Sequence, residues 1–509
     1  MNAAWLPLVV ALPLLASALT AAAPWRVVRL VLLLGTPLAT AVVGVWLIGI
    51  HRETPVLATS VGGFPAGIAI PFVSDTLSAV LLAVTGIATF VVLLFALRTG
   101  EDRLRFFPAL VLMLIAGVNG AFLTGDVFNL FVFVEVMLLP SYALLAMSGT
   151  WRRLGVGRLF LVVNLVTSSV FLVGIALLYA AAGTVNLAAL VGRGDDPKVA
   201  FGAAVVLFAL VVKAGAVPVH GWLPRAYPAT SATVMTLFGS LHSKVALVAV
   251  YRITAVVFAE NSVLLPAVVG LVVLSVIVGA WSSIGENTMR RILSFQLVSS
   301  NGHILIAVAL LSVAGYRGGL LYLVHSVLTL GALVLASGAV EQTYGTGHLV
   351  RLADLLRREK ALAWIVGLAL ISLVGFPPSA GFIGKAALVV ASAAATPWVA
   401  AVIIGSVIVA SILSLVATQR LWHDVFWGPK MTVYRSRLPA AVRSDESKDD
   451  LVPLPDSVRI PTLDLVPAGL MLVLSLAMFF GAGPTWDIAT RAAQGLVDLG
   501  PYVEAVRGR

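Results

Sequence analysis

Long apolar runs separated by short polar stretches dominate the chain of 509 residues. An α-helix needs about 20 mainly apolar residues to cross the hydrocarbon core of a bilayer, so the pattern predicts an all-α polytopic membrane protein with about 14 transmembrane helices. The predicted spans lie at residues 4–22, 27–50, 76–98, 106–124, 127–148, 158–182, 200–224, 231–257, 262–284, 292–313, 318–341, 361–390, 398–420 and 462–484.

The distribution of basic residues predicts how these helices are oriented. Of the 33 Lys and Arg residues, 22 lie in odd-numbered loops, seven lie in even-numbered loops or the termini, and four lie within helices. Cytoplasmic loops of membrane proteins are enriched in Lys and Arg. We therefore expect the odd-numbered loops to be cytoplasmic and both termini to lie outside. The same distribution explains the net charge of +10 without any binding of nucleic acid.

The composition excludes several kinds of chemistry. The chain has no Cys, which excludes disulfides, thiolate-bound zinc and Cys-ligated iron–sulfur clusters. It has no phosphate-binding loop of the form Gly-x-x-x-x-Gly-Lys-Ser/Thr, and its seven His residues are not spaced as metal ligands. We therefore expect no cofactor, no bound metal and no covalent catalysis.

Two predicted helices contain helix breakers near their middle. The span at 200–224 contains Ala-Val-Pro-Val-His-Gly-Trp-Leu-Pro at 216–224, and the span at 361–390 contains Gly-Phe-Pro-Pro-Ser-Ala-Gly at 375–381. Proline removes a backbone donor, so the carbonyls that it leaves unpaired must face protein or water rather than lipid. The breaks lie five helices apart, which predicts an inverted repeat of five-helix units, helices 4–8 and 9–13, with broken helices 7 and 12.

This division of the helices predicts five regions of the chain. They are N-terminal helices 1–3 at 1–105, a first half at 106–257, a second half at 262–420, a cytoplasmic linker at 421–461, and a C-terminal helix and tail at 462–509.

Four charged side chains, Glu135, Lys213, Lys244 and Lys385, lie within apolar spans, where each costs roughly 2.5 to 3.5 kcal/mol. Ionisable residues inside membrane spans typically pair with one another and mark ion or proton pathways. Glu135 is the only acid near the middle of the first half, so we expect it to pair with Lys213. Protonation of Glu135 would then free Lys213 to pass a proton towards Lys244. A static network of buried ion pairs is the alternative, although one acid does not neutralise three bases.

Three histidines are further candidates for the same pathway. His325 shares a helical face with Tyr322 and Thr329, and it is either a proton relay or a packing residue. His303 continues a polar stripe along its own helix and has the same two interpretations. His220 lies inside the first break, where it either relays protons or caps unpaired carbonyls.

Two other polar residues are expected to be structural, and a third, His242, is not expected to line one path together with Lys244. Asp126 begins the fifth helix and is expected to cap it. Arg252 lies near the end of the eighth helix and is expected to extend towards the membrane surface. His242 lies two residues from Lys244 and so points to a different face of the helix.

Three motifs carry a resemblance to a known family. Gly-Asp-Val-Phe-Asn-Leu-Phe-Val-Phe-Val-Glu at 125–135, Pro-Val-His-Gly-Trp-Leu-Pro at 218–224 and Pro-Pro-Ser-Ala-Gly-Phe-Ile-Gly-Lys at 377–385 resemble the proton-translocating subunits shared by complex I and the Mrp antiporters. The resemblance covers residues 75–420. The Gly-Asp-Val-Phe-Asn-Leu stretch and the chain length most resemble the D subunits of Mrp-type Na⁺/H⁺ antiporters.

The resemblance implies roles for the buried charges and reveals one departure. Glu135 matches the family's glutamate of helix 5, and the three buried lysines match its lysines of helices 7, 8 and 12. Relatives often carry another lysine one turn after the histidine of helix 11, where this chain has Thr329 and Leu330. We therefore expect the link between the two halves to depend on His325, Thr329 and water, or to be interrupted.

The favoured interpretation is a proton-translocating subunit of a multi-subunit antiporter that exchanges Na⁺ or K⁺ for protons in a bacterial plasma membrane. Such a chain is a secondary transporter rather than an enzyme, and its partners are other antiporter subunits and the lipid bilayer. The first alternative is a proton-pumping membrane-arm subunit of a complex I-like or hydrogenase-like oxidoreductase. The second is a scaffold with vestigial charges, in which neutralising Glu135 leaves transport intact.

Overall fold

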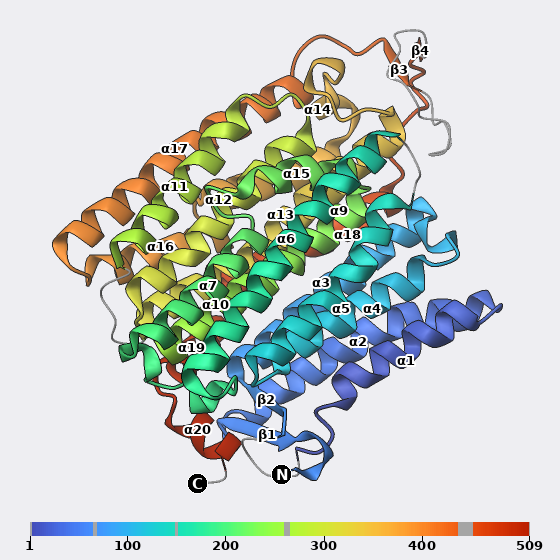
Figure 1. The fold of residues 1–509 in the computed structure, drawn as a ribbon. Helices are drawn as coiled ribbons and strands as arrows, with labels where there is room; N and C mark the ends of the chain where they lie inside the picture. The colour runs from blue at the N-terminus through green and yellow to red at the C-terminus, as the bar shows by residue number, and fades with distance from the viewer. Residues whose placement is uncertain (1–2, 65–68, 148–150, 259–264, 436–450, 508–509) are drawn as a thin grey trace.

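The computed structural model describes residues 3–64, 69–147, 151–258, 265–435 and 451–507, and over these residues the chain is mainly helical (Figure 1). Ten helical segments are long and apolar enough to cross a membrane: α2 (Arg26–Ile50), α3 (Thr76–Thr99), α5 (Val127–Ala146), α6 (Trp151–Ala182), α9 (Ala232–Ser240) followed by α10 (His242–Val257), α11 (Leu265–Ile284), α12 (Met289–Leu310), α13 (Val313–Tyr344), α17 (Pro397–Phe426) and α18 (Thr462–Phe480). Four shorter apolar helices accompany them: α1 (Leu8–Ala22), α4 (Phe107–Leu123), α15 (Lys360–Val374) and α16 (Ala380–Ala393). The predicted helical membrane protein is confirmed at this level.

The helices pack side by side with roughly aligned axes, and the two ends of the bundle differ (Figure 1). The terminal end carries both ends of the chain and the antiparallel hairpin of β1 (Val56–Ser60) and β2 (Pro71–Asp75). The linker end carries α14 (Leu355–Arg358) and the antiparallel pair of β3 (Val433–Arg435) and β4 (Leu451–Pro453). The prediction of an all-α fold did not include these two short strand pairs, which lie outside the apolar helices.

Burial separates central helices from peripheral ones. In α12, α13 and the α9–α10 segment, 94% of the spanning stretch is buried, against 33% in α2 and α17. A helix that is buried on all sides belongs to the centre of a bundle. The polar residues of α10, α12 and α13 therefore lie inside the protein and away from lipid.

The first predicted break is present. α7 (Pro197–Lys213) ends at its lysine, and the chain passes through residues 214–219 before the short helix α8 (Leu223–Ala226). Gly215 has a φ of +71°, in the left-handed region that favours glycine. Pro218 follows and cannot donate a backbone hydrogen bond. The last carbonyls of α7 therefore need partners from outside their own helix.

The second predicted break separates α15 from α16. Gly375 follows α15 with a φ of +95°, again in the left-handed region. Ser379 caps α16 by accepting a 3.2 Å hydrogen bond from the backbone N–H of Phe382. The carbonyls at the end of α15 are left without helical partners in the same way.

A third interruption lies within the span predicted at 231–257, which is a single apolar segment of spanning length in the structure. α9 and α10 are separated at Leu241, whose φ and ψ are −114° and −63°. Gly239 and Ser240 directly precede this point, and a Gly–Ser pair is a common site of helix kinks, so the sequence carries a weak breaker signal that the prediction did not use. The interruption directly precedes His242 and Lys244, which are buried polar residues that hydrogen-bond to other helices.

The ends of the last two predicted regions also differ from the prediction. α17 continues to Phe426, so the non-helical linker begins after that residue rather than at 421, and its residues 436–450 lie outside the described residues. The predicted tail forms two helices, α19 (Ala482–Val497) and α20 (Gly500–Arg507). α19 buries one stripe at helical spacing against α13 and α3. The residues of that stripe are Ala489, Ala492, Ala493 and Leu496.

Candidate functional site

Glu135 and Lys213 form the expected ion pair, and a serine joins them. Glu135 lies on α5, and its Oε1 is 3.8 Å from the Nζ of Lys213 at the end of α7. Ser168 on α6 lies between them, because its hydroxyl donates to the Glu135 carboxylate and accepts a 2.9 Å hydrogen bond from Lys213. The side chain of Lys213 is 6% exposed and that of Glu135 is 30% exposed. The acid is therefore the more accessible end of this three-residue cluster.

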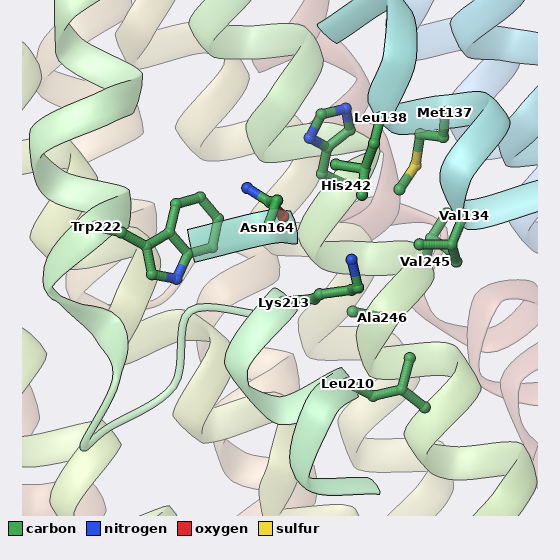
Figure 2. Close-up of a pocket in the computed structure, with 10 residues that line it drawn as sticks. All are labelled: Val134, Met137, Leu138, Asn164, Leu210, Lys213, Trp222, His242, Val245 and Ala246. Carbon is green, nitrogen blue, oxygen red and sulfur yellow. The ribbon is translucent and has the colours of Figure 1, made fainter. Parts of the chain in front are cut away.

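A small cavity lies beside Lys213 (Figure 2). Its volume is about 10 Å³, close to the space that one water molecule needs. Asn164, Trp222 and His242 also line it, and the amine of Lys213 is directed towards the side where Asn164 and His242 lie. His242 makes a 2.8 Å hydrogen bond through Nε2 to the hydroxyl of Ser141. The sequence interpretation correctly separated His242 from Lys244 but missed that His242 lies on the Lys213 side.

Lys244 is fully buried and is held by neutral partners from two central helices. Its Nζ donates to Asn301 Oδ1 on α12 at 3.0 Å and to the Ser326 hydroxyl on α13 at 2.9 Å. The amide of Asn301 donates a 2.7 Å hydrogen bond to the carbonyl of Ala214. Ala214 directly follows Lys213 at the first break. Asn301 therefore joins the first break to Lys244.

Two histidines and a tyrosine continue this polar row on α12 and α13. The His303 ring stacks on Tyr322 with 4.8 Å between centroids, and the Tyr322 ring lies 5.2 Å from that of His325. His303 bonds through Nδ1 to the carbonyl of Ser299 at 2.9 Å. In the described part of the chain, Nε2 of both histidines is buried without a hydrogen-bond partner. The predicted shared face of His325, Tyr322 and Thr329 is present.

Thr329 occupies the position where relatives often have a lysine, and hydroxyl groups surround it. Its Oγ1 lies 3.1 Å from His325 Nδ1, 3.0 Å from the Ser475 hydroxyl and 3.3 Å from the Ser372 hydroxyl. These partners come from α13, α18 and α15. A cluster of neutral groups that both donate and accept hydrogen bonds therefore takes the place of a charge.

Lys385 lies on α16, next to the second break. Its Nζ donates to the carbonyl of Val374 at 2.7 Å and to the Ser411 hydroxyl on α17 at 2.8 Å. A methyl group on Gly375 would lie 2.9 Å from Lys385 Cδ, so glycine is needed there for space as well as for its φ. Each break thus contributes one carbonyl to the polar row, through Asn301 in the first half and directly to Lys385 in the second.

The four buried charges differ in their counter-ions. Within the described ranges, Glu135 and Lys213 form an ion pair, whereas no carboxylate lies within 4.0 Å of the Nζ of Lys244 or Lys385. A static network of ion pairs therefore does not describe the arrangement. Neutral side chains complete the polar row: those of Ser168, Asn301, Ser326, Ser411 and Ser475. These residues carry no signal in the sequence, because single Ser or Asn residues are common in apolar helices.

His220 lies apart from this row. It is half-buried at the first break, and its ring is edge-on to that of Phe295 with 6.5 Å between centroids. No hydrogen bond in the described part of the chain joins His220 to a buried lysine. The carbonyl of Val212 is instead bound by the indole N–H of Trp222 at 3.1 Å.

The predicted capping role of Asp126 is confirmed, whereas the predicted position of the Arg252 side chain is wrong. Asp126 caps α5 by accepting a 2.8 Å hydrogen bond from the backbone N–H of Asn129, as predicted. Arg252 does not extend to the membrane surface. Its side chain is 13% exposed and donates to the carboxylate of Asp75 at 2.5 Å, because α3 presents a capping aspartate at the same level.

Comparisons with known sequences agree with this arrangement. The family model described as "NADH:quinone oxidoreductase/Mrp antiporter, TM" matches residues 124–412. The D subunit of the Na(+)/H(+) antiporter of Bacillus subtilis (strain 168) is 32% identical over 481 residues, 92% of each chain. The corresponding D subunit of Alkalihalophilus pseudofirmus is 30% identical over 478 residues, also 92% of each chain.

Comparisons with solved structures give the same picture. A chain in the structure of the Mrp complex from Dietzia sp. DQ12-45-1b is 37% identical, with a TM-score of 0.94 and 99% of both chains covered. A chain of respiratory complex I from Thermus thermophilus with bound NADH has a TM-score of 0.76 at 22% identity, covering 97% of this chain and 99% of that one. The second likeness concerns the fold alone.

Proposed function

Because the chain belongs to the NADH:quinone oxidoreductase/Mrp antiporter transmembrane family, we propose that it is the proton-translocating subunit of a multi-subunit antiporter that exchanges Na⁺ or K⁺ for protons. The observation that carries this proposal is the set of buried polar contacts around Glu135, Lys213, Lys244 and Lys385, to which both helix breaks contribute carbonyls. Ionisable groups in the interior of a membrane protein are costly and are kept where ions or protons move.

In the first half, Glu135 accepts a proton from the accessible side of the cluster. Its neutralisation leaves Lys213 without a counter-ion, and removing one partner of a buried ion pair costs about 3–5 kcal/mol. Ser168 couples the protonation state of Glu135 to Lys213, because its hydroxyl contacts both the carboxylate and the amine. Lys213 then gives up its proton more readily towards the cavity that it shares with His242.

Lys244 is the next acceptor. Asn301 binds both the first break and the Lys244 amine, so a change at the break alters the surroundings of this lysine directly. Ser326 binds Lys244 and directly follows His325 on α13, so Lys244 contacts the helix that carries this histidine. His220 is a further candidate on this path because it lies within the first break and is half-buried.

In the second half, protons pass along His303, His325 and Thr329 to Lys385. Imidazole and hydroxyl groups both donate and accept hydrogen bonds, so they relay protons without a permanent charge. The hydroxyls of Thr329, Ser372 and Ser475 replace the lysine that relatives often have. The halves are connected in this proposal by neutral groups and water.

We further propose that the chain crosses the membrane 14 times. The ten long segments account for ten crossings, and α1, α4, the broken pair α7–α8 and the broken pair α15–α16 account for the other four. Each broken pair crosses as one interrupted helix, since its halves are joined at the polar row and not at an end of the bundle.

The proposed inverted repeat is supported by two matching backbone contacts. In the first half, Val127 N–H donates to the Val185 carbonyl at 2.9 Å, and Leu187 N–H donates to that of Gly125 at 2.9 Å. In the second half, Met289 N–H donates to the Gly347 carbonyl at 3.0 Å, and Leu349 N–H donates to that of Asn287 at 2.9 Å. Each position in the second set is 162 residues after its counterpart, as in 127 and 289 or 187 and 349.

We propose that the linker end faces the cytoplasm of a bacterial plasma membrane. That end carries α14 and the β3–β4 pair, which belong to the two odd-numbered loops richest in Lys and Arg. The other antiporter subunits are the partners, and the partly exposed Glu135 needs one of them or a water-filled cavity beside it, because lipid does not solvate a carboxylate.

The proposal is tested by cation/proton exchange in membrane vesicles from cells that lack native antiporters and express the complete set of subunits. Glu135→Gln and Lys385→Met should each lower the rate of Na⁺- or K⁺-driven exchange at least tenfold with the complex still assembled. Glu286→Gln is the matched control, because Glu286 pairs with Arg291 at the linker end, away from the polar row.

Two results would contradict the proposal. Exchange that is unchanged by Glu135→Gln would indicate a scaffold with vestigial charges. A wild-type complex that shows no exchange but acidifies vesicles when a redox partner is oxidised would indicate the membrane-arm alternative.

A further inference from the structure

An ion pair that the polar row does not use lies towards the terminal end of the bundle. Arg252 on α10 donates to Asp75 at 2.5 Å, and Asp75 also caps α3 by accepting from the backbone N–H and hydroxyl of Ser78. Asp75 is 5% exposed, so the pair is shielded from solvent. A buried pair of this kind is costly to form and rarely contributes stability alone, which suggests another use.

The C-terminal helix covers the pair. The guanidinium carbon of Arg252 lies 5.2 Å from the centre of the Tyr502 ring on α20, and Tyr502 is itself 2% exposed. Glycine at position 125 leaves room for this ring, because a methyl group there would lie 3.1 Å from the Tyr502 oxygen. α20 thus places one aromatic side chain over the charged pair from the outer side.

Polar atoms without partners gather around this pair. Arg252 Nη1, Tyr316 Oη and Tyr502 Oη are buried with no hydrogen-bond partner among the described residues. Buried polar atoms are nearly always satisfied by protein or by ordered water. Three such atoms near one ion pair mark a region that suits water better than close packing.

The same region continues inwards to Lys244. Tyr251 lies seven residues after Lys244, two helical turns along one face of α10, or about 10 Å. Its hydroxyl donates to the carbonyl of Ile304 at 2.6 Å, one turn beyond the Asn301 that holds Lys244. The Tyr316 ring packs on that of Tyr251 with 5.3 Å between centroids. Polar side chains thus connect Lys244 with the ion pair.

We propose that Arg252, Asp75 and Tyr502 form an outer gate, which closes a proton outlet between Lys244 and the terminal end. This inference rests on the proposed function. The fixed positive charge of Arg252 repels protons and other cations in the outlet, as an arginine does in pores that exclude cations. Asp75 holds the guanidinium in place, and Tyr502 keeps the surrounding solvent away from both.

The gate is tested on the complete complex in proteoliposomes by imposing a pH gradient without Na⁺ or K⁺. Asp75→Asn keeps a residue that caps α3 but removes the charge that holds Arg252. It should make the gradient collapse at least threefold faster than in the wild type. Asp464→Asn is the matched control. It breaks the 2.9 Å ion pair between Asp464 on α18 and Arg98, which lies at the end of α3 opposite to Asp75, and it should leave the leak unchanged.

A second measurement reports access to the outlet directly. The chain has no Cys, so Val248→Cys, one turn from both Lys244 and Arg252 and 7% exposed, introduces a single thiol into it. A membrane-impermeant maleimide added on the terminal side should label this thiol at least fivefold faster when Asp75→Asn or Tyr502→Leu is also present. Tyr502→Leu leaves the ion pair intact and serves if Asp75→Asn fails to assemble.

The outcomes separate this inference from the proposed function. Faster leak and faster labelling, with the Asp464→Asn control unchanged, support the gate. Unchanged leak and labelling in both gate variants, or an equal leak in the control, overturn it and leave the pair as an anchor for α20. In that case loss of exchange in Glu135→Gln still supports the proposed function, whereas exchange that survives Glu135→Gln contradicts the proposed function itself.

Discussion

At the scale of residues, the Ser168 hydroxyl lies between the carboxylate of Glu135 and the amine of Lys213. Ser168 contacts both Glu135 and Lys213, and hydrogen bonds to charged groups contribute about 1.5–3 kcal/mol. We predict that Ser168→Ala lowers the exchange rate about tenfold, which corresponds to about 1.4 kcal/mol. Initial rates of exchange in vesicles measure this. Ser169→Ala is the control, because that neighbouring hydroxyl is exposed and bonds only within its own helix; equal losses in both variants would exclude a specific role for Ser168.

Thr329 tests whether neutral groups connect the two halves. Thr329→Val keeps the shape of the side chain but leaves His325, Ser372 and Ser475 without a shared partner, at a cost of about 1–3 kcal/mol. We predict a severalfold loss of exchange in Thr329→Val and near wild-type exchange in Thr329→Ser. Rates from the two purified complexes, compared at equal protein content, decide this. Full activity of the valine variant would mean that protons do not pass this point.

The sequence predicted the charged residues of the site far better than their neutral partners. A charge in an apolar span is costly and therefore conspicuous, which is why Glu135 and the three lysines were identified. Asn301 and Ser326 are common residue types whose partners lie 57 and 82 positions away, so only the folded chain brings them together. Arg252 was misinterpreted for the same reason, since Asp75 lies 177 positions before it.

At the scale of elements, the two breaks place carbonyl groups and lysines together. Gly375 tests this, because its φ of +95° disfavours any side chain and a methyl group would crowd Lys385 Cδ at 2.9 Å. An L-residue in left-handed backbone costs roughly 1–2 kcal/mol. We predict that Gly375→Ala lowers both the thermal stability of the complex and its exchange rate, measured on the same preparation.

The control for this change is Gly405→Ala on α17, where a methyl group meets nothing within 4 Å and alanine favours the helix. It should leave both quantities unchanged or raise stability slightly. Wild-type exchange in Gly375→Ala would show that the position of Lys385 beside the break is not needed.

Two of the three helix interruptions could be predicted from the sequence. Prolines and glycines announced the breaks in the seventh and twelfth predicted helices, because their backbone chemistry is local. The interruption at Leu241 follows Gly239 and Ser240, which are a weaker signal than proline, so it was missed. α19 and α20 were missed because a short amphipathic stripe after the last span resembles a polar tail until its packing partners are known.

At the scale of the whole molecule, the polar row runs sideways through the bundle. It starts at Glu135, whose side chain is 30% exposed, and ends at Lys385 and Ser411 beside the peripheral helix α17. Glu135 and the three lysines therefore follow one another parallel to the membrane plane and not along the membrane normal. In the proposed function, a change of charge passes from one of these neighbours to the next, in agreement with a chain that has other antiporter subunits as partners.

The orientation of the molecule gives the last prediction. Val350 at the linker end is 83% exposed and Val61 at the terminal end is 44% exposed, and each can be changed to Cys in a chain that has none. Since cytoplasmic loops collect basic residues, we predict that a membrane-impermeant maleimide labels only Val61→Cys in right-side-out vesicles and only Val350→Cys in inside-out vesicles. Labelling of both variants after solubilisation in detergent shows that both thiols are reactive. The reverse pattern would place the linker end outside, and the outer gate would then open towards the cytoplasm.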